Sequence, residues 1–110
     1  MKSTTGQHVT LGVEAMATLS EYLELALDKG AQLVMVRSRV SEASTLYVGD
    51  VASTDEDLKK CGVIQNGVAD AILDATESGF NGLNINGEAY RFMRFFAEVG
   101  HQGAVVFAAV

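Results

Sequence analysis

The sequence predicts an α+β domain in which two main helices pack on a mostly antiparallel sheet that ends in a C-terminal β-meander. Two stretches carry the three-and-four spacing of an amphipathic helix, and the last third of the chain alternates apolar and polar residues between tight turns. The 110 residues leave room for one domain, residues 1–110, and 48% of them are hydrophobic, which is enough to form a core.

The first helix is predicted over residues 13–29. Its apolar residues recur at helical spacing and are Met16, Leu19, Leu23, Ala26 and Leu27. Gly30 follows at the position where a glycine commonly ends a helix. Residues 1–9 are polar and lack periodicity, so we expect them to be flexible or to form an edge segment.

Two strands are predicted after this helix. Residues 32–40, "QLVMVRSRV", are rich in valine and contain no glycine or proline, which is typical of a strand in the middle of a sheet. The segment "SEAS", either a turn or a short helical piece, separates it from "TLYVGDV", residues 45–51, where we expect a second and shorter strand.

A second helix is predicted from Thr54 to Ser78, with an N-cap at Ser53 or Thr54 and acidic residues in its first turn. Its apolar stripe consists of Leu58, Cys61, Ile64 or Gln65, Val68, Ile72 and Ala75. Gly62 and Gly67 each cost about 1 kcal/mol relative to alanine in a helix interior. A turn at "QNGV" is therefore an alternative, and the sequence leaves residues 61–67 open between helix and turn.

The C-terminal meander is predicted from two turn signals. Asn86-Gly87 lies between alternating runs, and both residues tolerate the positive φ that a type I′ hairpin turn requires. The segment "GHQG" marks a second turn, which gives strands at 82–85, 88–99 and 103–109. In the long middle strand one face carries Tyr90, Phe92, Arg94 and Phe96, and the other carries Ala89, Arg91, Met93, Phe95, Ala97 and Val99.

The composition excludes several classes of function. Eight basic and 14 acidic residues give a net charge of −6, which repels a phosphate backbone, so we expect no nucleic-acid partner. No apolar stretch approaches the roughly 18 residues of a membrane-spanning helix, and the N-terminus does not resemble an export signal. The single cysteine cannot form an internal disulfide. These features favour a cytoplasmic protein that does not bind membranes.

No motif predicts a catalytic or metal centre. Cys61 lies on the apolar stripe of the predicted second helix, where a thiol usually behaves as a small hydrophobe. His101 lies in a predicted turn, where a solvated histidine is ordinary, and neither it nor His8 has metal-ligand spacing to Cys61. Phosphate-binding glycine loops are also missing, so we expect no cofactor, no metal and no catalytic residue.

Arg37 and Arg39 form the one candidate ligand site. Both project from the same face of the predicted strand at 32–40, and two guanidinium groups there could bind a carboxylate or phosphate. The alternative is structural: the strand leaves the core at this point, and the arginines pair with glutamates of the first helix such as Glu21 or Glu24.

The sequence leads to one main hypothesis and two alternatives. The apolar surplus on both faces of the meander favours a non-enzymatic protein-interaction domain, either a homodimer or an accessory to a larger protein. The first alternative is a binder of small anions, or a minor enzyme, that uses Arg37 and Arg39. The second is an acidic mimic of nucleic acid, for which −6 is a modest charge.

Overall fold

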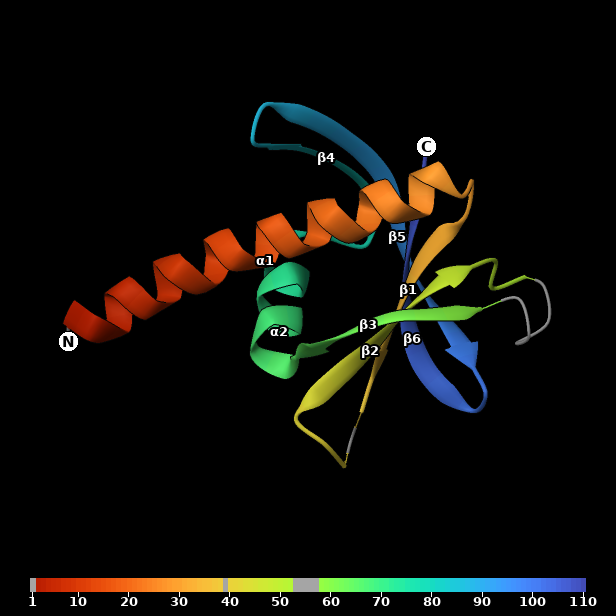
Figure 1. Ribbon diagram of the computed structural model, residues 1–110, viewed down its shortest axis with the longest axis horizontal. Helices are drawn as coiled ribbons and strands as arrows, with labels where there is room; N and C mark the ends of the chain where they lie inside the picture. Colours follow the sequence, from red (N-terminus) through yellow and green to blue (C-terminus); the bar gives the residue numbers. More distant parts are fainter. Residues whose placement is uncertain (1, 39, 53–57) are drawn as a thin grey trace.

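The computed structural model describes residues 2–38, 40–52 and 58–110, with only the backbone for residues 2–11. The chain forms two helices and six strands (Figure 1). In chain order they are α1 (Lys2–Asp28), β1 (Gln32–Arg37), β2 (Ala43–Gly49), β3 (Lys59–Gln65), α2 (Asn66–Ala75), β4 (Gly79–Ile85), β5 (Glu88–Val99) and β6 (Gln102–Ala109).

The six strands form one sheet in the order β3-β2-β1-β6-β5-β4. Every neighbouring pair is antiparallel, and β1 joins the two meanders by pairing with β6. The predicted α+β class with a C-terminal meander is therefore confirmed. None of the described helices is long and apolar enough to cross a membrane.

Both helices pack on the same face of the sheet (Figure 1). From α1 the buried residues are Ala15, Leu19, Leu23 and Ala26, whose spacing of three and four places them on one side of the helix. From the sheet the main core comes from alternate positions of the strands: Leu33, Met35, Leu46, Phe92 and Phe107. The rings of Phe92 and Phe107 meet with centroids 5.7 Å apart.

Arg94 of β5 holds the end of α2 on the sheet. Its Nη1 donates to the carbonyl oxygens of Leu73 at 3.0 Å and Thr76 at 2.9 Å, and contacts Thr76 Oγ1 at 2.7 Å. Carbonyl groups at a helix C-terminus lack partners within the helix and carry partial negative charge, so a guanidinium stabilises them. This explains why a cation occupies the helix-covered face of β5.

The predicted second helix is wrong over its first half. Residues 59–65 form strand β3, and the helix starts only at Asn66, so Cys61 lies in a strand and residues 61–67 are neither all helix nor a turn. Pairing with β2 overrides the apolar spacing that suggested a helix. Tyr22 of α1 lies where a Cβ on Gly62 would be, so this glycine allows α1 to approach β3.

The expected N-cap at Ser53 or Thr54 and the acidic residues at 55–57 lie outside the described residues.

Other boundaries also differ from those expected: β2 covers residues 43–49 and not 45–51, and β4 starts at Gly79 and not at residue 82. The first helix begins at Lys2, well before Val13, and whether residues 1–9 are flexible stays a prediction. The first strand ends at Arg37, and Val40 beyond it is 98% exposed. The two turns of the meander are confirmed, with positive φ at Asn86 (54°) and Gly87 (85°) and at the Gly100-His101 pair.

Replacing glycine by alanine at two positions will have opposite effects. Gly87→Ala forces a side chain into the left-handed region and will lower the free energy of unfolding by about 1–2 kcal/mol. Gly12→Ala, in an exposed part of α1 with open space around it, will raise it by up to about 1 kcal/mol. Urea unfolding measures both changes; a loss of stability at both positions would contradict the helical assignment at Gly12.

Candidate functional site

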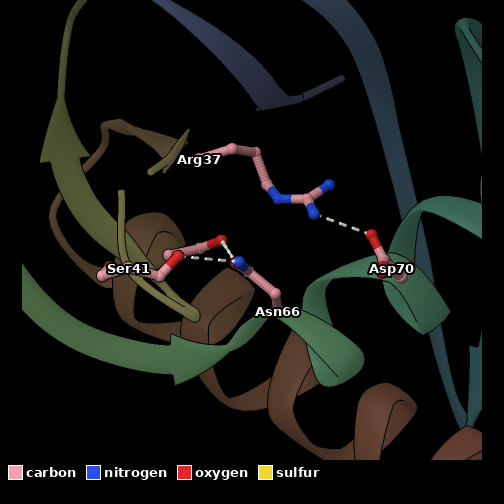
Figure 2. Close-up of polar contacts among 5 residues, drawn as sticks. Arg37, Ser41, Asn66 and Asp70 are labelled. Atoms are coloured by element: carbon pink, nitrogen blue, oxygen red, sulfur yellow. Dashed lines mark hydrogen bonds and ion pairs between the residues drawn. The ribbon is translucent and has the colours of Figure 1, made fainter. Parts of the chain in front are cut away.

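Arg37 lies at the end of β1 and pairs with a carboxylate of α2 (Figure 2). Its Nη2 is 2.8 Å from Asp70 Oδ1, and both side chains are partly exposed. The guanidinium Nε is buried and meets no acceptor among the described residues. Arg37 thus forms an ion pair with a helix carboxylate, as the structural alternative predicted. The partner is Asp70 of α2, however, and not Glu21 or Glu24 of α1.

The polar residues beside this ion pair fasten the start of α2 to β2. Ser44 Oγ is 2.6 Å from Asn66 Oδ1, and Asn66 Nδ2 donates to the carbonyl oxygen of Ser41 at 3.3 Å (Figure 2). The backbone N–H of Asn66 donates to the carbonyl oxygen of Glu42. These bonds give the cluster a structural role. Arg39 lies outside the described residues, so anion binding by Arg37 and Arg39 stays a prediction.

Cys61 and His101 do not form a catalytic pair. Cys61 belongs to β3, which β2, β1 and β6 separate from β5 in the sheet, whereas His101 occupies the exposed turn between β5 and β6. Burial raises the pKa of the Cys61 thiol, which disfavours the thiolate that a nucleophile needs. Among the described residues no three potential metal ligands gather in one place.

The face of the sheet opposite α1 and α2, here called the helix-free face, is only partly covered. At its centre Val34, Val36, Ala104 and Val106 form a second buried cluster. Val51 and Leu58, both in the connection between β2 and β3, pack against this cluster together with Tyr47, Ala97 and Val99. The cover therefore lies over the centre of the sheet, formed by β1 and β6.

Towards β4 the same face exposes three large apolar side chains, here called the β4–β5 patch: Phe80, Met93 and Phe95. Phe80 lies directly opposite Met93 in the β4–β5 register, and Phe95 follows two positions along β5 on the same face. They are 54%, 40% and 39% exposed. The alternation of Met93 and Phe95 in the sequence indicated an apolar face, but only the register with β4 adds Phe80 to it.

The β4–β5 patch lacks acidic neighbours in its own two strands. The residues that these strands direct to the helix-free face are Phe80, Gly82, Asn84, Ala89, Arg91, Met93, Phe95, Ala97 and Val99. None of them is a carboxylate, although the chain has 14 acidic residues. These positions therefore carry the positive charge of Arg91 and no negative charge.

A cavity of about 460 Å³ lies on the other face, between the C-terminal half of α1 and the start of β5. Its walls include Leu23, Leu27, Phe92 and Phe107. Tyr90 donates a hydrogen bond of 2.7 Å to Glu24 Oε1 at the edge of this cavity. The bond to the Glu24 carboxylate, reinforced by burial, raises the pKa of Tyr90 from 10.0 to about 12.

No family model matches the chain, and the comparisons with curated proteins and with solved structures gave no match either.

The pKa of Tyr90 provides a test of the Glu24 hydrogen bond. In an ultraviolet titration one of the three tyrosines will ionise only near pH 12. Because the folded-state pKa is raised, the stabilisation from this bond is complete below pH 10 and is lost as the pH rises through 12. Glu24→Gln will lower the pKa of Tyr90 towards 10; an unchanged late titration would contradict the role of Glu24.

Proposed function

We propose that this protein is a non-enzymatic interaction domain that binds a second copy of itself through the helix-free face. The observation that carries this proposal is the β4–β5 patch, where Phe80, Met93 and Phe95 are exposed together on neighbouring strands. Isolated exposed apolar side chains are normal on proteins, whereas a contiguous group is typical of an interaction surface.

Apolar burial provides the driving force for this contact. Covering the exposed parts of the three side chains contributes roughly 1 kcal/mol for each side chain in each protomer. Two sheets that pack face to face are about 10 Å apart and interdigitate their side chains, an arrangement in which Phe80, Met93 and Phe95 of one copy can pack against those of the other.

The distribution of charge favours a second copy as the partner. In a two-fold dimer the same patch meets itself, so a carboxylate there would face its own copy across the interface. The helix-free positions of β4 and β5 have no carboxylate, which keeps the acidic groups of these strands away from the contact. With a net charge of −6 on each chain, this placement limits the repulsion between two copies.

The test compares two phenylalanines on opposite faces. Phe80→Lys places a charge in the β4–β5 patch and is expected to shift the dimer to monomer. Phe96→Lys is the matched control. Phe96 is 74% exposed, but its side chain lies on the opposite face of β5, the face on which α1 and α2 pack. Sedimentation velocity measures the dimer fraction, and thermal unfolding checks that both variants fold.

A dimer that Phe80→Lys dissociates and Phe96→Lys leaves intact supports the proposal. A dimer that survives Phe80→Lys places self-association elsewhere, and a wild-type protein that stays monomeric overturns binding to a second copy.

A further inference from the structure

Strand β4 forms one edge of the sheet, and its outer side is open. It pairs with β5 alone, and the β4–β5 hairpin extends away from the other strands (Figure 1). Because β5 lies between β4 and β6, the outer side of β4 is not in line with β6. Among the described residues, no strand lies beside β4 on that side.

The backbone groups that face this open side belong to Phe80, Gly82 and Asn84. Val110 N–H donates to the carbonyl oxygen of Arg91, so the N–H and C=O of Arg91 point to β6 and not to β4. Gly82 lies opposite Arg91 in the β4–β5 register and therefore points away from β5. Alternate residues of a strand point the same way, so Phe80 and Asn84 also point outward. We call the N–H and C=O groups of these three residues the β4 edge.

The β4 edge is accessible to solvent. All three of its residues are exposed, and because Gly82 has no side chain, the exposed surface of Gly82 is backbone. The ring of Phe80 lies 3.7 Å from the position that a Cβ on Gly82 would take, on the helix-free side of the strand. A strand that approaches β4 from outside therefore meets free backbone donors and acceptors.

The opposite edge of the sheet, β3, has features that deter pairing, and β4 has none of them. In β3, Lys59 and Lys60 are exposed charges, and the register with β2 shifts so that Cys61 has no partner. Strand β4 contains no charged residue and no proline, and its register with β5 is continuous from Gly79 to Ile85. Since proteins commonly protect a free edge, an unprotected edge of this length indicates a strand that is used for pairing.

Phe80 determines which side chains suit an added strand. Its ring is 54% exposed and leans over Gly82, where β4 has no side chain of its own. A β-branched residue opposite Phe80 or Gly82 would pack against this ring, and such aromatic–β-branched pairs across strands are favourable. On the helix side of β4, Asn81 and Ile85 are already buried, so specificity depends on the helix-free side.

The strands of a second copy suit this edge poorly. Two-fold pairing of β4 with itself, centred on Gly82, places Asn84 opposite Phe80 and leaves the ring without an apolar partner. Pairing with β3 brings Lys59 and Lys60 to the contact. The charge of the occupant is limited as well, because a chain with a net charge of −6 repels an acidic segment.

We infer that the β4 edge binds an extended segment of a partner protein that has β-branched apolar residues at alternate positions and no acidic residue. The segment adds a strand beside β4 and pairs its backbone with Phe80, Gly82 and Asn84. Its β-branched side chains pack against the ring of Phe80. The backbone pairing supplies affinity, and the alternate side chains supply specificity. This contact goes beyond the binding of a second copy, because it uses the edge of the sheet and not its helix-free face.

Blocked peptides test the backbone pairing. The probe is acetyl-Lys-Thr-Val-Thr-Val-Thr-Lys-amide, in which both valines lie on one side and the terminal lysines keep the peptide soluble. A second peptide is N-methylated at both valines, whose N–H groups face β4 in the inferred register. A third is N-methylated at the last two threonines, whose N–H groups face away. We expect the second peptide to bind at least about tenfold more weakly than the probe, and the third to bind as the probe does.

A fourth peptide tests the side chains. It has glutamate in place of both valines, and we expect no binding of this peptide at millimolar concentration. Binding as tight as that of the probe would contradict the packing against Phe80 and the exclusion of acidic segments.

The binding site is located by NMR. Titration with the probe should shift the amide signals of Phe80, Gly82 and Asn84 and slow their hydrogen exchange, because these N–H groups gain acceptors. Equal binding of the two N-methylated peptides, or no binding of the probe at millimolar concentration, would overturn the inference. Shifts confined to Met93 and Phe95 would also overturn it, and would leave the proposed dimer through the helix-free face standing.

Two substitutions of Gly82 provide matched variants. Gly82→Pro removes an outward N–H without removing a bond to β5, and should weaken binding of the probe at least about tenfold. Gly82→Ala keeps this N–H, and its Cβ makes an ordinary contact of 3.7 Å with the ring of Phe80, so the affinity should stay within about twofold.

Thermal unfolding checks that both variants fold, and the N-methylated peptides test the same pairing on the unmodified protein. An equal loss of affinity in both variants would assign the effect to side-chain space over Gly82 and would contradict backbone pairing. Unchanged affinity in a folded Gly82→Pro variant would contradict it as well.

Discussion

The packing of both helices on one face of a six-stranded sheet is the constraint from which the other features of this protein follow. The apolar stripe of α1 meets the inward residues of β1, β2, β5 and β6, and Arg94 fixes the end of α2 to β5. Since α1 and α2 both lie on that face, neither covers the opposite one. The sheet must therefore bury its second face by other means or leave it exposed.

The protein does both, on different parts of the sheet. Over β1 and β6 the second apolar cluster is covered by residues of the β2–β3 connection, whereas Phe80, Met93 and Phe95 remain exposed over β4 and β5. Strand β5 is central to this division because its alternate residues serve the core on one side and the β4–β5 patch on the other. Its first residues also line the cavity under α1.

Local patterns predicted much of this fold. Asn86-Gly87 and "GHQG" gave the turns of the meander, and the alternation along 88–99 gave its two faces, because both signals depend on neighbouring residues. Strand β3 was missed because its apolar spacing also fits a helix, and the contacts that decide it, with β2 and with Tyr22, come from distant parts of the chain. For the same reason no sequence pattern could show that Arg37 meets Asp70, that Phe80 joins Met93, or that Glu24 meets Tyr90.

The most direct test of the helix-free face is the solution mass of the unmodified protein, measured by light scattering during size-exclusion chromatography over a tenfold range of concentration. Binding between the exposed patches of two copies predicts a mass that approaches twice that of one chain as the concentration rises. A mass of one chain at every concentration would show that the exposed patch does not bind its own copy, and would contradict the proposed dimer.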